Sequence, residues 1–193
     1  MKTRNLIPSA VVVSLTLFAC GGHQQPLESS EVEVQDPEHD EAEATLERCQ
    51  SLTEVLLAAP GSGNGDLMLT VHYAYEDVYL NCLEALDTLV PPGEEHTLNT
   101  LAYGVMHLQS TRIGVEALYG MEEEERTCDL LALGIVQSDQ FFEDINNIDP
   151  PTDIVVAERV LQLRMMGLDT AQFFEAAYQQ VFDGACPTVP MAP

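Results

Sequence analysis

Basic residues are scarce in this chain of 193 residues, which has 7 lysines and arginines against 32 aspartates and glutamates. The formal net charge is −25 at neutral pH. A field of this sign repels nucleic acid and anionic lipid headgroups, and it attracts a basic protein surface or a cation. The charge therefore excludes nucleic acid as a partner. Solubility in a salty habitat is the other interpretation of the same composition.

The sequence also lacks the motifs of the common catalytic and cofactor sites. It contains no G-x-S-x-G, no H-E-x-x-H, no phosphate-binding glycine loop and no C-x-x-C-H. A carboxylate di-metal bundle needs Glu-x-x-His on inward helix faces. The one acidic residue that stands three before a histidine is Asp36, before His39. We therefore expect no cofactor and no enzymatic activity.

No apolar run in the sequence is long enough to cross a bilayer. Residues 6–18 form a mostly apolar run that follows Lys2 and Arg4, but about 20 apolar residues are needed for a membrane span. A positive head, a short apolar core and small residues after it are typical of an export signal. We expect residues 1–19 to be removed, which leaves five basic residues and no lysine in the mature chain.

The end of this signal, Leu17-Phe18-Ala19-Cys20, resembles the lipobox of bacterial lipoprotein precursors. The resemblance implies that Cys20 receives a diacylglyceryl group on its thiol, that the signal is cut before it, and that palmitate or a similar acyl group is added to the new amino terminus. It implies a lipid-anchored envelope protein. Gly21 stands where aspartate signals inner-membrane retention in enteric bacteria, which favours the outer membrane facing the periplasm. An ordinary secretory signal that ends in an unrelated cysteine is the alternative.

Composition divides the chain into a signal peptide at 1–19, a lipidated cysteine with an acidic tether at 20–43, and a domain at 44–193. The tether is rich in Glu, Asp, Gln, Ser, His and Pro, and so few aliphatic residues cannot offset the entropy of ordering the chain. This predicts disorder. His23 and His39 stand among its acidic residues, and a loosely held metal is an open alternative there. The domain is long enough for one core.

Apolar residues recur every three or four positions in the domain, which predicts α-helices and no strands. Proline and glycine clusters separate five helical segments. Their apolar seams are, in chain order, Ala42, Leu46, Cys49, Leu52 and Leu56; Val71, Tyr75, Val78, Cys82, Ala85 and Leu89; Leu101, Val105, Leu108 and Val115; Cys128, Leu131, Ile135, Phe142, Ile145 and Ile148; and Ile154, Ala157, Leu161 and Leu168. An up-and-down bundle of about five or six helices buries such seams.

Three local patterns predict where helices begin or break. Asp66 is placed to cap the second helix. Glu122–Glu125 should open the fourth, because negative charge is favourable at the positive end of a helix. Asp169 and Gln172 resemble a capping box, so we expect a kink or two short helices at 167–172.

Four cysteines remain in the domain, namely Cys49, Cys82, Cys128 and Cys186. An even number in an exported protein predicts two disulfides. Three pairings are possible. An antiparallel hairpin of the first two helices favours Cys49–Cys82, and the returning tail favours Cys128–Cys186. A metal site is the rival interpretation, but successive separations of 33, 46 and 58 residues lack the close pairs that such a site uses.

Two arginines stand on or near apolar seams. Arg112 lies on the seam of the third helix, and Arg164 lies near that of the fifth. In a chain with so few basic residues they could line an anion-binding cleft. More often such arginines pair with acidic residues, here Glu116 or Glu76, while their stems pack on the core.

His107 stands on a face of the third helix that is otherwise small. The face consists of Gly104, His107, Thr111 and Gly114, and it allows another helix to approach closely. His107 could meet His72 and Glu76 of the second helix as a cation site. A histidine at such a boundary is more often purely structural.

These observations favour a non-enzymatic lipoprotein that binds another envelope protein, as an adaptor or scaffold, through a groove of the bundle or its acidic face. In general build it is similar to the small pilotins that carry secretion channels to the outer membrane, although no motif carries over. The alternative is a periplasmic lipoprotein that binds a small ligand or a cation near Arg112, Arg164 or His107.

Overall fold

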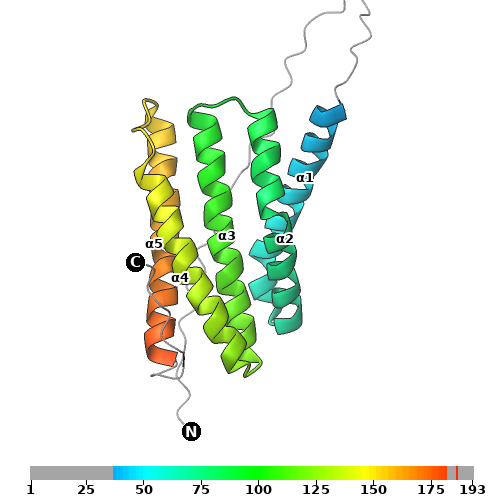
Figure 1. Ribbon diagram of the computed structural model, residues 1–193, viewed down its shortest axis with the longest axis vertical. Helices are drawn as coiled ribbons and strands as arrows, with labels where there is room; N and C mark the ends of the chain where they lie inside the picture. Colours follow the sequence, from blue (N-terminus) through cyan, green and yellow to red (C-terminus); the bar gives the residue numbers. More distant parts are fainter. Residues whose placement is uncertain (1–36, 182–185, 187–193) are drawn as a thin grey trace, which may run out of the picture. The chain divides into compact units, whose positions relative to one another are not determined.

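The computed structural model describes residues 37–181 and residue 186, and these form an all-α bundle (Figure 1). The helices are α1 (Pro37–Ala58), α2 (Gly65–Leu89), α3 (Glu94–Gly120), α4 (Glu124–Asn146) and α5 (Ile154–Val181), with a short 3-10 turn at Ala59–Ser62. No strand occurs in these ranges, so the predicted helical bundle is confirmed. None of the helices described is both long and apolar enough to span a membrane. The predicted signal and Cys20 lie outside the described residues.

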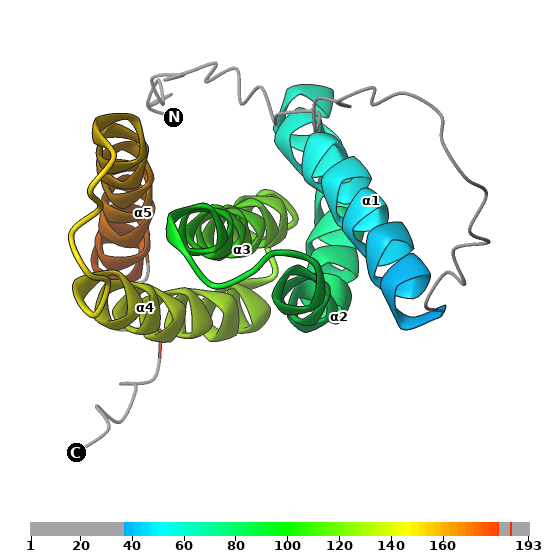
Figure 2. The same ribbon diagram turned by 90° about the horizontal axis from the view of Figure 1, so that it is seen from above.

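Helix α3 lies at the centre of the bundle, with α2, α4 and α5 packed around it (Figure 2). α1 lies on the outer side of α2. Because α3 has neighbours on several sides, its buried residues are spread around its circumference. They include Leu101, Val105, Met106, Leu108, Ile113, Val115, Ala117 and Leu118. The seams predicted for the first four helices are buried or half-buried.

The first helix begins earlier than the composition indicates. Residues 37–43 were assigned to the tether, but they form the first two turns of α1. Pro37 suits the first helical position, where its missing N–H has no helical acceptor to lose. Glu38 and Asp40 in the first turn favour the positive end of the helix, and Ala42 is buried. Residues 37–43, predicted to lie in the tether, therefore belong to the first helix.

Two other helix starts differ from the prediction. Asn64, and not Asp66, caps α2, because the Asn64 side chain accepts a hydrogen bond from the N–H of Leu67 at 3.2 Å. A cap needs extended backbone, which Asn64 has, whereas Asp66 is already inside the first turn. α4 begins at Glu124, because Glu122 has φ 61° and forms the left-handed turn between α3 and α4.

The break predicted at 167–172 is absent, and α5 is continuous. Asp169 lies inside α5, and its carboxylate accepts a hydrogen bond from Arg112 of α3 at 3.3 Å instead of capping a helix. Gly167 lies directly against the ring of Phe141 on α4, where a Cβ would have no room. The residues that resemble a helix break thus hold α5 against α3 and α4.

The favoured disulfide pairing is confirmed. Cys49–Cys82 joins α1 to α2, and Cys128–Cys186 joins residue 186 to α4, with Cα–Cα distances of 6.0 and 5.4 Å. All four cysteines are buried. The bridges close segments of 33 and 58 residues, and in the chain-entropy picture each stabilises the fold by about 4 kcal/mol.

Gly134 supplies a test of the packing between α4 and α5. A Cβ at this position would lie 2.5 Å from Cε1 of Phe174. We expect Gly134→Ala to lower the free energy of unfolding by about 1–3 kcal/mol, because the ring has to move within a close-packed core. Gly120→Ala is the matched control, since a Cβ there meets nothing within 4 Å. Urea unfolding followed by circular dichroism measures both, and equal effects would contradict this packing.

The disulfide pairing predicts a pattern of thiol reactivity. Denatured, non-reduced mature protein should react with maleimide at none of the four domain cysteines, and reduced protein should react at all four. Cys82→Ser should free the thiol of Cys49 alone, because Cys128 and Cys186 are bonded to each other. Mass spectrometry identifies the labelled residues. Labelling of two or more cysteines in the non-reduced wild type would reject the two-disulfide scheme.

Candidate functional site

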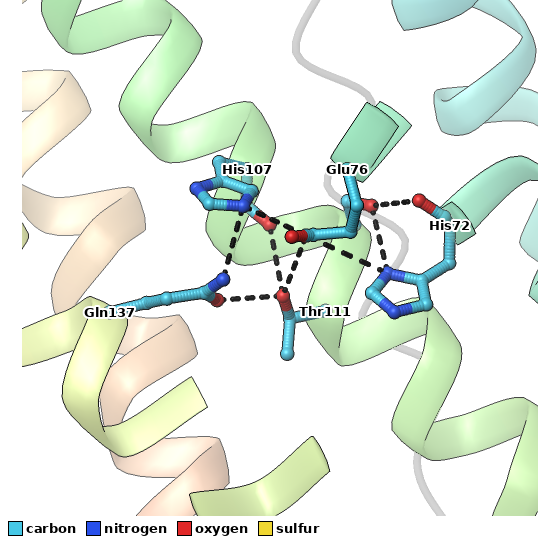
Figure 3. Close-up of polar contacts among 6 residues, drawn as sticks. His72, Glu76, His107, Thr111 and Gln137 are labelled. Atoms are coloured by element: carbon cyan, nitrogen blue, oxygen red, sulfur yellow. Dashed lines mark hydrogen bonds and ion pairs between the residues drawn. The ribbon is translucent and has the colours of Figure 1, made fainter. Parts of the chain in front are cut away.

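Polar side chains from three helices meet inside the bundle (Figure 3). His72 and Glu76 come from α2, His107 and Thr111 from α3, and Gln137 from α4. A spacing of four residues places each pair on one face of its helix. His72, Glu76 and His107 do lie together, and a cation held by them stays a prediction. Sequence reasoning missed the part of Gln137, because nothing in the pattern of α4 distinguishes this half-buried glutamine from the exposed polar residues of the helix.

Glu76 is the hub of this polar cluster. Its Oε1 lies 2.8 Å from Nε2 of His107 and 3.9 Å from Nδ1 of His72. The Thr111 hydroxyl donates to Oε1 of Gln137 at 2.7 Å, and Nε2 of Gln137 lies 3.0 Å from Nε2 of His107. That nitrogen has room for one proton, so it either donates to Glu76 or accepts from Gln137. The proton positions of the three side chains are therefore linked.

The two histidines lie in different surroundings. The ring of Tyr79 stacks on His107 with centroids 4.0 Å apart, and burial raises the pKa of Tyr79 to about 12. His72 is 1% exposed. Its Nδ1 lies 3.1 Å from Oγ of Ser110, and it packs where a Cβ on Gly114 would be 2.8 Å from its Cδ2. The predicted small face of α3 thus does allow α2 to approach.

Burial lowers the pKa of His72 from its ordinary value of 6.5; Glu76 opposes this shift and His107 adds to it. His72 is therefore neutral at neutral pH, and Glu76 makes its shorter contact with His107. The polar atoms of the cluster are hydrogen-bonded to one another, which is what keeps buried polar groups stable.

A metal site needs several ligand atoms around one point. Within 37–181 and 186, the group of His, Cys, Asp or Glu side chains that comes this close is His39, Asp40 and Glu43, with ligand atoms within 4.8 Å of one another. All three side chains are exposed on the first turns of α1, where such groups are common without an ion. His23, the other histidine predicted in the tether, lies outside the described residues.

The two seam arginines contact different partners. Nε of Arg112 donates to Glu116 at 3.1 Å, and Nη1 donates to Asp169 of α5 at 3.3 Å. Its guanidinium lies 4.6 Å from the centroid of the Phe173 ring. Nη2 of Arg164 donates to Oδ1 of Asn146 at the end of α4, at 3.5 Å. This favours pairing over a shared anion cleft, and Glu116 is the partner of Arg112, whereas Glu76 bonds His107. A role of Arg112, Arg164 or His107 in ligand binding stays a prediction.

The apolar seam predicted for the fifth segment faces solvent. Ile154 is 74% exposed, Leu161 59% and Leu168 40%, so their assignment to the interior is wrong. Met165, one helical turn from Leu161 and Leu168, is 59% exposed. The side of α5 that is buried consists of Leu163, Gly167, Thr170, Ala171 and Phe174. We call Ile154, Leu161, Met165 and Leu168 the outer apolar face.

A groove of about 310 Å³ lies between α4 and α5 beside the outer apolar face. Leu168 belongs to both features. The groove is lined by Ile135, Ser138, Asp139 and Phe142 of α4 and by Leu168, Ala171, Gln172 and Glu175 of α5. Four of the eight lining residues are apolar and four are polar, and Asp139 and Glu175 are exposed, so the groove is mixed in character and carries negative charge. The sequence could have indicated this exposed face, because α5 carries apolar residues along two stripes and a helix at the edge of a bundle buries only one of them.

Comparison with known proteins adds no family to these observations. No family model, no curated protein and no solved structure matches the chain. The features that bear on function are therefore the polar cluster, the contacts of Arg112, and the outer apolar face with its groove.

His72 makes the stability of the domain depend on pH. Because its pKa is lower in the folded protein than in the unfolded chain, the unfolded chain binds the proton more readily. The free energy of unfolding should therefore fall as pH is lowered through the unfolded value of 6.5. His72→Gln should reduce this slope between about pH 7.5 and 5.5, whereas His39→Gln, on the exposed start of α1, should not. Urea unfolding across that range gives the slopes, and parallel profiles for wild type and His72→Gln would contradict the assignment.

Proposed function

We propose that this protein is a bacterial envelope lipoprotein, anchored through Cys20, whose helical domain binds another envelope protein and catalyses no reaction. The anchor is supported by the positively charged head, the short apolar run and the lipobox-like residues 17–20. Several acyl chains at one terminus, each contributing about 0.8 kcal/mol per buried methylene, hold a protein stably on a membrane. The acidic segment after Cys20 gives the domain reach from the surface.

The outer apolar face of α5 is the observation that carries the protein-binding part of the proposal. Among the described residues, α5 holds five of thirteen large exposed hydrophobic side chains: Ile154, Val155, Leu161, Met165 and Leu168. Apolar side chains exposed singly are normal, but a contiguous exposed stripe marks an interaction surface in a soluble domain. A groove continuous with that stripe gives a partner side chain somewhere to insert.

The polar side chains support protein binding indirectly, because contacts within the domain already occupy them. His107 contacts Glu76 and Gln137, and Arg112 contacts Glu116 and Asp169. A small ligand or a cation would have to displace these contacts. The alternative of a small-ligand or cation-binding lipoprotein therefore has weaker support than protein binding.

Replacing the anchor cysteine tests the location. We expect Cys20→Ser to keep the helical circular dichroism of the domain and to leave the membrane fraction, because the acyl chains have no thiol to join. Ser30→Ala, a small change in the same segment, is the control and should stay with the membranes. Sedimentation in high salt removes electrostatic adsorption. A Cys20→Ser protein that still sediments with membranes would contradict the anchor.

Crosslinking in intact cells, detergent extraction and mass spectrometry test the binding function. Wild-type protein should return one stoichiometric envelope protein. Leu161→Ser/Met165→Ser should lose it, while Leu80→Ser, which changes a side chain 72% exposed on α2, should keep it. If no partner returns, and divalent cations or phosphate raise the melting temperature of purified protein, the ligand-binding alternative replaces this proposal.

A further inference from the structure

The outer apolar face of α5 and the groove beside it set the dimensions of a binding surface. From Ile154 to Leu168 the helix advances fourteen residues, which at 1.5 Å per residue is about 21 Å. The groove then continues along α5 from Leu168 to Glu175. An elongated surface of this length, with the α4–α5 groove at one end, matches the apolar face of a partner helix, which packs at about 8–10 Å between axes.

An extended partner strand has no comparable site here. Strand addition requires an exposed sheet edge, and residues 37–181 contain no strand. Helix-in-groove recognition instead uses apolar anchors spaced at three, four and seven residues. The spacings of Ile154, Leu161, Met165 and Leu168 are seven, four and three, so a partner helix with the same repeat can match them.

The charge of the surface selects the sign of the partner. α4 carries six acidic side chains and one basic, and α5 carries three acidic and two basic. Asp139 and Glu175 flank the groove itself. A second copy of a chain with net charge −25 is repelled from this surface. Residues 187–193 of the chain itself contain no basic side chain to complement it.

We propose that the outer apolar face of α5 and the α4–α5 groove bind a basic amphipathic helix of the partner protein. Its aliphatic anchors contact Leu161, Met165 and Leu168, and its lysines or arginines lie against Asp139 and Glu175. This inference rests on the proposed protein-binding function and specifies the chemistry of the partner. The apolar contact supplies most of the affinity, and the charges steer association and exclude acidic surfaces.

A designed peptide tests the inference directly. The probe is a fluorescent helical peptide of about 18 residues, with leucines spaced by seven, four and three residues and lysines at the other positions. Its binding to full-length mature lipoprotein in zwitterionic nanodiscs is followed by fluorescence anisotropy. We expect Leu161→Ser/Met165→Ser to weaken binding about tenfold or more, and Leu80→Ser to leave it unchanged. Asp139→Asn/Glu175→Gln should weaken binding and reduce its salt dependence, whereas Asp129→Asn/Glu84→Gln should change it less.

A control peptide of the same composition separates specific binding from attraction by the net charge. Scrambling the leucines removes the apolar face while keeping every lysine, so this peptide should bind much more weakly. The inference is overturned if the scrambled peptide binds as tightly as the helical probe, or if Leu161→Ser/Met165→Ser binds the helical probe like wild type. It is overturned as well if wild type shows no binding of the probe. It is also overturned if wild-type protein self-associates in sedimentation, or adsorbs to zwitterionic vesicles, and Leu161→Ser/Met165→Ser abolishes this. A second copy or a lipid surface is then the occupant.

The crosslinking experiment keeps this inference separate from the proposed function. If the α5 variant still captures the stoichiometric partner, protein binding stands and the location of the site is wrong. If neither wild type nor variant captures a protein, the proposed function fails as well.

Discussion

Close contact between helices at three glycines is the constraint on which the rest of this structure depends. Gly114 admits the ring of His72, Gly134 admits Phe174, and Gly167 admits Phe141. Each pair locks one helix against another at a distance that any larger residue would prevent. The first pair sets the approach of α2 to α3, and the other two fix the rotation of α4 and α5 about their own axes. Which residues are buried and which face solvent follows from that rotation.

The polar cluster is a consequence of the same close approach. With α2 held near α3, Glu76 reaches His107, and Thr111 reaches Gln137 across to α4. These bonds are directional, unlike the apolar contacts around them, so they specify one alignment of three helices. Arg112 plays the corresponding part between α3 and α5. The polar cluster and Arg112, which the sequence offers as candidate ligands, thus help to define the register of the helices in the bundle.

The packing of α4 on α5 leaves apolar surface in solvent on a strongly acidic protein. Negative charge keeps copies of the chain apart, which limits self-association through this face. A large negative net charge is therefore compatible with an exposed apolar face.

The sequence by itself determined the helical class and the apolar seams of the first four helices, because helix periodicity is local. The even number of domain cysteines predicted two disulfides, and the antiparallel packing of the helices decided which cysteines pair. Spacing placed His72 and Glu76 on one face of a helix, and the packing of α2 on α3 brought His107 to them. The sequence did not determine which side of α5 is buried, because both stripes satisfy the helical repeat, and only the fit of Gly134 and Gly167 around Phe174 and Phe141 chooses between them. The capping-box pattern at Asp169 predicted a helix break wrongly for the same reason, because its side chain bonds Arg112, fifty-seven residues away along the chain. Local pattern defines the faces that a helix offers, and tertiary packing decides which of them the protein buries.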